Sequence, residues 1–140
     1  MSQAVFVDAS AWVAIANRRD RNYQDAVQIF RRLLESSTPL VTTTWTTYEA
    51  LSIVKSRLGF SQAERLWERI NSRSVVDLTR IDEQSERGAL EIFWRYKDKK
   101  WGVVDCVSLV VMQSLDCRHA FVYDGHFVEA SRQFGFSVVE

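Results

Sequence analysis

Four acidic side chains in this sequence stand where they could act together. Each lies beside the expected end of a buried strand or near the start of a helix, with no Lys or Arg within one helical turn. Carboxylates brought together without basic partners repel one another, and a bound cation relieves that repulsion. The pattern therefore favours a site that binds a cation and uses it in chemistry. The four residues are Asp8, Glu49, Asp105 and Asp124.

The kind of side chain that would bind the cation restricts which metal the site can hold. Sites made of carboxylates alone suit Mg²⁺ or Mn²⁺, which keep several waters and take one or two carboxylates each. Zinc is disfavoured, because the two Cys and two His residues show no zinc-ligand spacing. The sequence also lacks a phosphate-binding G-x-x-x-x-G-K loop, a dinucleotide-binding G-x-G-x-x-G loop and the G-x-S-x-G turn of serine hydrolases.

Two of the acids follow expected strands. Asp8 ends the apolar run 4–7 and Asp124 ends the run 120–123. Ligands of doubly wound sheets bind beyond the carboxyl ends of the strands, so both side chains would face that edge. Each also has a structural interpretation: Asp8 could cap the following helix, and Asp124 before Gly125 is a common turn pair.

The other two acids lie on helices. Asp105 falls in the first turn of the most apolar helix, on the same face as Leu109 and Met112, where the helix N-terminus favours a negative charge. Glu49 lies one turn into the helix expected at 44–58 and has apolar neighbours at positions 45 and 53. Taken singly, Asp105 could serve only the helix dipole and Glu49 only the solvated surface. The four together favour a shared site.

These acids must be positioned by a sheet and its helices. Short apolar runs alternate with helical patterns, which predicts a parallel sheet covered on both faces. We expect one domain over residues 1–140, a three-layer α/β/α sandwich with four or five parallel strands. The expected strands are 4–7, 40–42, 75–78, 120–123 and 137–139. The expected helices are 9–17, 22–36, 44–58, 61–70, 82–97, 104–115 and 128–134.

Local signals mark several helix ends. Gly59 should end one helix, and Ser61 with Glu64 forms the pattern of a capping box that would start the next. Asp82 is an expected N-cap and Gly135 an expected C-cap. The two middle helices carry more large apolar surface than one small core covers, which predicts a homodimer and a groove for an apolar partner segment. The residues concerned are Trp45, Tyr48, Leu58, Trp67 and Ile70.

Composition narrows the class of protein. No apolar run reaches the 18 or so residues of a membrane span, and the first residues do not resemble a signal peptide. Cys106 and Cys117 would be too far apart to bridge if both lay on the expected helix. We therefore expect a reduced, cytoplasmic protein with no membrane partner. Lys and Arg total 18 and Asp and Glu total 18, so that outside the four site acids about four positive charges are in excess.

At these acids the chain resembles PIN-domain ribonucleases, and VapC-type toxins in particular. The resemblance covers the whole chain, with each motif weak alone and the four together fairly specific. One departure is Gly102-Val103-Val104, where many relatives have a Ser or Thr just before the third acid. The matching motifs are Val7-Asp8-Ala9-Ser10-Ala11, Tyr48-Glu49-Ala50-Leu51, Val104-Asp105-Cys106-Val107-Ser108 and Tyr123-Asp124-Gly125-His126-Phe127.

The resemblance implies a PIN-like fold and metal-dependent endonucleolytic cleavage of RNA by the toxin of a toxin–antitoxin pair. Asp8, Asp105 and Asp124 would bind Mg²⁺ or Mn²⁺ directly or through water. Glu49 would be a ligand or the base that orients the attacking water. Ser10 either orients Asp8 or a metal-bound water, or caps the helix. The implied partners are an RNA substrate, a cognate antitoxin protein and a second copy of the chain.

Some assignments stay open at this stage. His126 could approach a phosphate or be an ordinary loop residue, and two basic clusters could contact RNA or be solvated. A haloacid-dehalogenase-type enzyme would need a second acid at position 10, and a receiver-type regulatory domain would need adjacent acids near the first strand. A catalytically inactive PIN-like module that binds RNA or protein would keep every motif. The basic clusters are Arg18, Arg19, Arg21 and Lys97, Lys99, Lys100.

Overall fold

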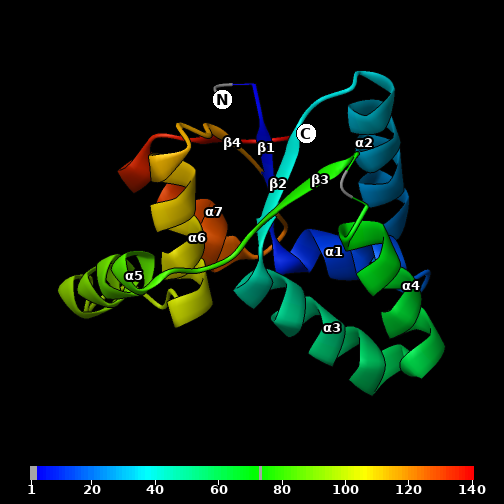
Figure 1. Cartoon of the computed structure of the whole chain (residues 1–140), viewed down its shortest axis with the longest axis horizontal. Helices are drawn as coiled ribbons and strands as arrows, with labels where there is room; N and C mark the ends of the chain where they lie inside the picture. Colours follow the sequence, from blue (N-terminus) through cyan, green and yellow to red (C-terminus); the bar gives the residue numbers. More distant parts are fainter. Residues whose placement is uncertain (1–2, 73) are drawn as a thin grey trace.

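A computed structural model describes residues 3–72 and 74–140, and within them one parallel sheet has the strand order β3-β2-β1-β4-β5 (Figure 1). Its central strand pairs on both sides, with Phe6 opposite Val41 and Ala120. This confirms the predicted parallel sheet, with five strands. They are β1 (Val5–Val7), β2 (Leu40–Thr43), β3 (Val76–Thr79), β4 (His119–Phe121) and β5 (Ser137–Val138).

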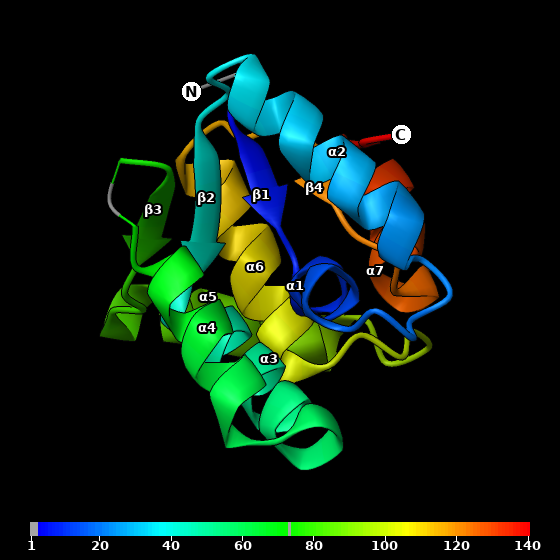
Figure 2. The ribbon, with the colours of Figure 1, turned by 90° about the vertical axis from the view of Figure 1, so that its right-hand side faces the viewer.

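Helices cover both faces of this sheet. Figures 1 and 2 show α1, α2 and α4 on one face and α5, α6 and α7 on the other, while α3 lies beyond the carboxyl ends of the central strands. The predicted three-layer α/β/α sandwich is therefore confirmed. In the described ranges the helices are α1 (Ala9–Ala16), α2 (Tyr23–Glu35), α3 (Thr44–Leu58), α4 (Phe60–Ile70), α5 (Glu83–Arg95), α6 (Val103–Ser114) and α7 (Gly125–Phe134).

The alternation of β1 explains the two cores. Val5 and Val7 are buried among side chains of α1, α2 and α4, whereas Phe6 is buried among side chains of α6 and α7. Because successive side chains of a strand point to opposite faces, a strand covered on both faces must be apolar throughout. The last residue of this buried strand is followed at once by Asp8, so the sheet fixes the position of that carboxylate.

Several element ends differ from the sequence predictions. Helix α4 begins at Phe60, with Gly59 at its N-cap and no side-chain cap, so the capping box predicted at Ser61 is wrong. Gly59 has a φ of 96°, which glycine tolerates, and it ends α3 and precedes α4 in a single residue. Helix α7 begins at Gly125 rather than at residue 128, because Asp124 caps it. Asp82 does cap α5, as expected.

The cysteines and the middle helices also need correction. Cys117 lies after the end of α6 rather than on one helix with Cys106, although both thiols are free and buried. Ile70 is fully buried in the core, whereas Tyr48 and Trp67 are 50% and 40% exposed. The unpartnered surface of α3 and α4 is therefore smaller than the sequence pattern predicted. No helix among the described residues is long and apolar enough to span a membrane.

Candidate active site

The four predicted acids line a single cleft at the carboxyl edge of the sheet. They come from the ends of β1 and β4 and from the N-terminal parts of α3 and α6, and the cleft encloses about 310 Å³. Parallel strands place these positions at one edge, which is why residues 116 positions apart meet there. The lining residues are Asp8, Ala9, Ser10, Val13, Asp20, Asn22, Glu49, Ile53, Arg57, Asp105, Tyr123 and Asp124.

Asp8 is fixed by the turn from β1 into α1. It is the N-cap of α1 and only 4% exposed. Its Oδ2 accepts hydrogen bonds from the backbone N–H of Ser10 at 3.0 Å and from the Ser10 hydroxyl at 2.7 Å. Burial raises the pKa of Asp8, the Ser10 hydrogen bonds oppose that rise, and the charge of Asp124 adds to it. Capping and a place in the cleft are thus combined in one residue.

Ser10 also connects Asp8 to the segment after β4. Its hydroxyl oxygen accepts from the backbone N–H of Tyr123 at 2.9 Å and of Asp124 at 3.2 Å. The Asp124 carboxylate in turn caps α7 by accepting from the N–H of His126 at 2.9 Å. One serine hydroxyl therefore sets the position of two acids that are remote in the sequence.

Asp105 and Glu49 are affected both by burial and by the charges of the other acids in the cleft. The pKa of Asp105 is raised to about 7, first by burial and then by the charge of Asp8, with smaller effects from Asp124 and Glu49. A hydrogen bond from the N–H of Gly102, at 3.0 Å, acts in the opposite direction. Partial burial and the charges of Asp8 and Asp124 raise the pKa of Glu49. The carboxylates therefore lie close enough to disfavour joint ionisation.

A buried chain of hydroxyl groups joins the helices that carry Glu49 and Asp105. The Thr43 hydroxyl donates to that of Thr46 at 2.9 Å, which lies 3.4 Å from the hydroxyl of Ser108. Ser108 donates to the carbonyl of Val104 at 3.0 Å. Each hydroxyl has one proton, so the donors run in one direction from β2 through α3 to α6. The sequence analysis missed this chain, although the threonine-rich run at 42–47 is its visible signal.

The cleft also contains residues that the sequence did not single out. Asp20 and Asn22 come from the loop between α1 and α2, and Asp20 Oδ1 accepts from the N–H of Asn22 at 2.8 Å. Arg57, near the end of α3, is the one basic residue among the described lining residues. A loop acid and a helix-end arginine carry no spacing signal, so only the folded chain reveals them.

Other sequence candidates lie elsewhere. His126 is exposed and does not line the cleft. Lys97, Lys99 and Lys100 lie between α5 and α6, and the Lys99 ammonium is 3.9 Å from both Asp98 and Glu129. Nothing in these contacts relates this cluster to the acids. Arg18 and Arg19 line a separate neighbouring pocket.

The donor chemistry of the cleft fits a hard divalent cation. Its acids offer carboxylate oxygens, and none of the ion pairs found among the described residues involves them. Within residues 3–72 and 74–140, no three Asp, Glu, His or Cys side chains are gathered as a ready ligand shell. Carboxylate oxygens are nevertheless the donors that Mg²⁺ and Mn²⁺ prefer, and these ions keep water as several of their ligands.

The chain is similar to known proteins along almost all of its length. The family model described as the PIN domain matches residues 5–133. The chain belongs to the PIN domain family. Among curated proteins, it is 28% identical over 127 residues to the 23S rRNA-specific endonuclease VapC20 of Mycobacterium tuberculosis, covering 90% of this chain and 93% of that protein.

Solved structures agree with the PIN assignment. The crystal structure of M. tuberculosis VapC20, titled a sarcin-ricin loop cleaving toxin, superposes with a TM-score of 0.80 over 90% of this chain and 94% of that chain. The structure of FitAcB from Neisseria gonorrhoeae has a TM-score of 0.66 at 12% identity, covering 97% and 96% of the two chains, and shares the fold. The resemblance to VapC-type PIN domains is confirmed, and the receiver-type and haloacid-dehalogenase-type alternatives are not favoured.

Proposed function

We propose that this PIN protein is a metal-dependent endoribonuclease that acts as the toxin of a toxin–antitoxin pair. The observation that carries the proposal is the convergence of four acids from separate elements on one cleft, in a chain related over nine-tenths of its length to an endonuclease toxin. Carboxylates without basic partners are suited to hold a divalent cation, and such a cation supplies the activation of water and the neutralisation of a scissile phosphate.

The residues of this chain would divide that work. Asp8 and Asp105, the more buried acids, would hold the cation. Asp124, the N-cap of α7, would lie beside them. Glu49 is exposed at the mouth of the cleft, and its raised pKa suits it to accept a proton from the attacking water. Ser10 would keep Asp8 and Asp124 in register through its three hydrogen bonds to them and to Tyr123.

We also propose two protein partners. A cognate antitoxin would inhibit the toxin, and a second copy of the chain would cover the exposed aromatics of α3 and α4. On these helices Tyr48, Phe60 and Trp67 are 50%, 66% and 40% exposed. These three large side chains lie on two adjoining helices and would offer apolar surface to a second copy.

Cleavage of purified RNA tests the enzymatic proposal. The wild-type protein should cleave RNA with Mg²⁺ or Mn²⁺ and lose that activity in EDTA. Asp8→Asn should be inactive, because asparagine keeps the cap and accepts from Ser10 but removes the charge. The matched control is Asp82→Asn, the same change at the N-cap of α5 outside the cleft. Equal cleavage by wild type and Asp8→Asn would contradict a role of the acidic cleft in the reaction. A wild type that cleaves no RNA would leave a PIN module that only binds RNA or protein.

A growth assay tests the toxin role separately. Expression of the wild type in a bacterial host should arrest growth, and expression of Asp8→Asn at the same level should not. Coexpression of the antitoxin encoded beside the toxin gene should restore growth. Cleavage in vitro without growth arrest would support the nuclease and contradict the toxin assignment.

A further inference from the structure

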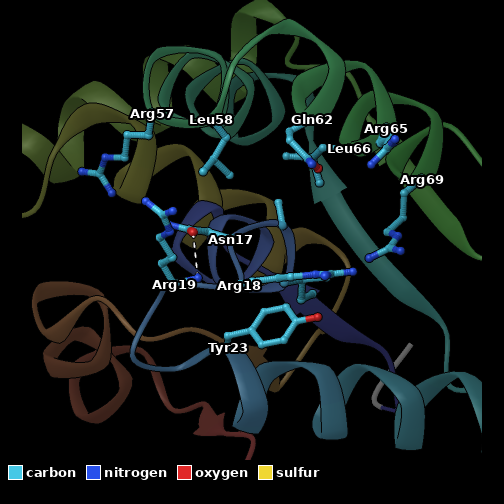
Figure 3. Close-up of a pocket in the computed structure, with 12 residues that line it drawn as sticks. Asn17, Arg18, Arg19, Tyr23, Arg57, Leu58, Gln62, Arg65, Leu66 and Arg69 are labelled. Carbon is cyan, nitrogen blue, oxygen red and sulfur yellow. Dashed lines mark hydrogen bonds between the residues drawn. The ribbon is translucent and has the colours of Figure 1, made fainter.

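A second pocket adjoins the acidic cleft and has the opposite charge. It encloses about 680 Å³. One wall comes from the end of α1, the loop after it and the start of α2, and the other comes from the end of α3 and from α4. Figure 3 shows Arg18, Arg19 and Tyr23 along one wall and Arg57, Arg65 and Arg69 along the other. Five arginines line it, and none of its described lining residues is acidic.

No acidic side chain among the described residues forms an ion pair with these arginines. All five side chains are exposed. The guanidinium of Arg69 packs over the ring of Phe30, 5.4 Å from its centroid, which positions the group without neutralising it. An anionic ligand would therefore meet guanidinium groups already free to bind.

The pocket borders the acidic cleft. Arg57 lines both, so its side chain marks the boundary between the carboxylates and the arginines. An anionic chain that presented one phosphate to a cation in the cleft would have its next phosphates directed across Arg57 toward α4. The guanidinium fork matches the oxygens of a phosphate in a bidentate contact.

We infer that the arginine pocket binds the RNA backbone on one side of the scissile phosphate, an inference that rests on the proposed nuclease function. A phosphodiester chain accounts for both surfaces, because it is anionic along its length and reacts at a cation site. An acidic protein segment would match the arginines alone, because it offers no phosphodiester bond to a cation in the adjoining cleft. The substrate therefore extends from the acids over α1 to α4, and Arg65 and Arg69 form the far end of its path.

Binding of a fluorescent, mixed-sequence single-stranded RNA to the metal-free protein in EDTA tests this path without cleavage. The variant is Arg65→Gln with Arg69→Gln, at exposed positions away from the acids. Its affinity should fall on the order of tenfold, and the slope of log K against log salt should shrink by about 1.4, since each phosphate contact on a single strand contributes about 0.7. In the cleavage assay its KM should rise while kcat stays unchanged.

The matched control has the same loss of charge elsewhere. Arg87→Gln with Arg132→Gln removes two exposed arginines of α5 and α7 that do not line the pocket. It should keep the wild-type affinity and salt slope. Equal losses in both double variants would indicate a general charge effect and overturn the inference, and so would RNA binding that neither variant changes.

Two further outcomes separate the possible failures. If the pocket variant keeps its RNA affinity but loses binding of polyglutamate, the pocket belongs to an acidic protein partner and the inference is overturned. If the wild type binds RNA through these arginines but cleaves no RNA with Mn²⁺, the binding path stands and the proposed nuclease function fails. Melting curves of the wild type and both double variants verify that each variant is folded.

Discussion

The hydroxyl of Ser10 lies 2.7 Å from Oδ2 of Asp8 and donates a hydrogen bond to it. The same oxygen accepts from the backbone N–H groups of Tyr123 and Asp124. Because a hydroxyl carries one proton and two lone pairs, these three contacts use its full capacity. The start of α1 and the segment before α7 are therefore held together by one side chain, and with them two acids of the cleft.

Ser10→Ala should reduce cleavage while the protein stays folded. Residues that orient a metal ligand typically change metal affinity or activity 10–100-fold when removed, so we expect a loss of about that size, partly recovered at higher Mg²⁺. The control is Ser114→Ala, which removes a similar hydroxyl bond, to the carbonyl of Val111, at the far end of α6. Cleavage rates of both variants and the wild type, measured over a range of Mg²⁺ concentrations, test this prediction. Unchanged activity in Ser10→Ala would contradict a positioning role.

Thr46→Val should destabilise the protein and lower kcat together. Valine has nearly the shape of threonine, but the change removes the middle hydroxyl of the chain from Thr43 to Ser108. Thr46 is fully buried, so the free energy of unfolding should fall by about 1–3 kcal/mol. Thr47→Val is the matched control, since among the described residues its hydroxyl bonds only to the carbonyl of Thr43. Denaturant melts and cleavage rates should change less in the control; equal effects would count against a linked hydroxyl chain.

The sequence predicted the positions of those acids that follow a buried strand or lie on an apolar helix. Asp8 and Asp124 could be placed because parallel strands present their carboxyl ends at one edge. Asp105 could be placed because its helix is apolar along the face that it shares with Leu109 and Met112, both buried. The parallel sheet and its covering layers followed from apolar runs alternating with helical patterns, whereas the strand order β3-β2-β1-β4-β5 came only from the structure. For these residues, position along the chain determines position in space.

Loop and side-chain contacts could not be predicted in this way. Asp20 lines the cleft from the loop between α1 and α2, and no periodicity describes such a loop. The capping pattern at Ser61 fitted a helix start, but Gly59 already joins α3 to α4. Arg57 borders the acids only because α3 crosses beyond the strands. Each case depends on tertiary packing between segments that are distant in the sequence.

The exposed aromatics predict self-association. At high micromolar concentration the wild type should sediment as a dimer, and Phe60→Glu with Trp67→Glu should shift it toward a monomer, because burying a carboxylate at the interface is costly. Trp94→Glu is the control, at a 67% exposed tryptophan of α5. A wild type that remains monomeric throughout the concentration series would contradict the dimer.

Divalent cations should stabilise the folded protein through the same acids that we propose for RNA cleavage. A ligand that binds only the folded state adds about 2.7 kcal/mol to the free energy of unfolding at 100 times its Kd. Mg²⁺ or Mn²⁺ should therefore raise the Tm of the wild type, and raise that of Asp105→Asn much less. Melting curves with metal and with EDTA measure both shifts. If the metal raised the Tm of both proteins equally, Asp105 would not be one of the residues that bind the metal.

Without metal, Asp105 should make stability fall as pH rises. Its folded-state pKa of about 7 exceeds the ordinary 3.8, so the folded state binds more protons than the unfolded state between these values. The resulting destabilisation is absent below pH 4, grows toward pH 7 and is complete above it.

Asp105→Asn lacks this ionisation, and its side-chain oxygen can still accept from Gly102. In EDTA its Tm should exceed that of the wild type by several degrees at pH 8, with the difference disappearing near pH 4. Asp82→Asn should show no such gain, because hydrogen bonds from Ser85 lower the pKa of Asp82. If Asp105 only capped its helix, the variant would instead melt below the wild type at pH 8.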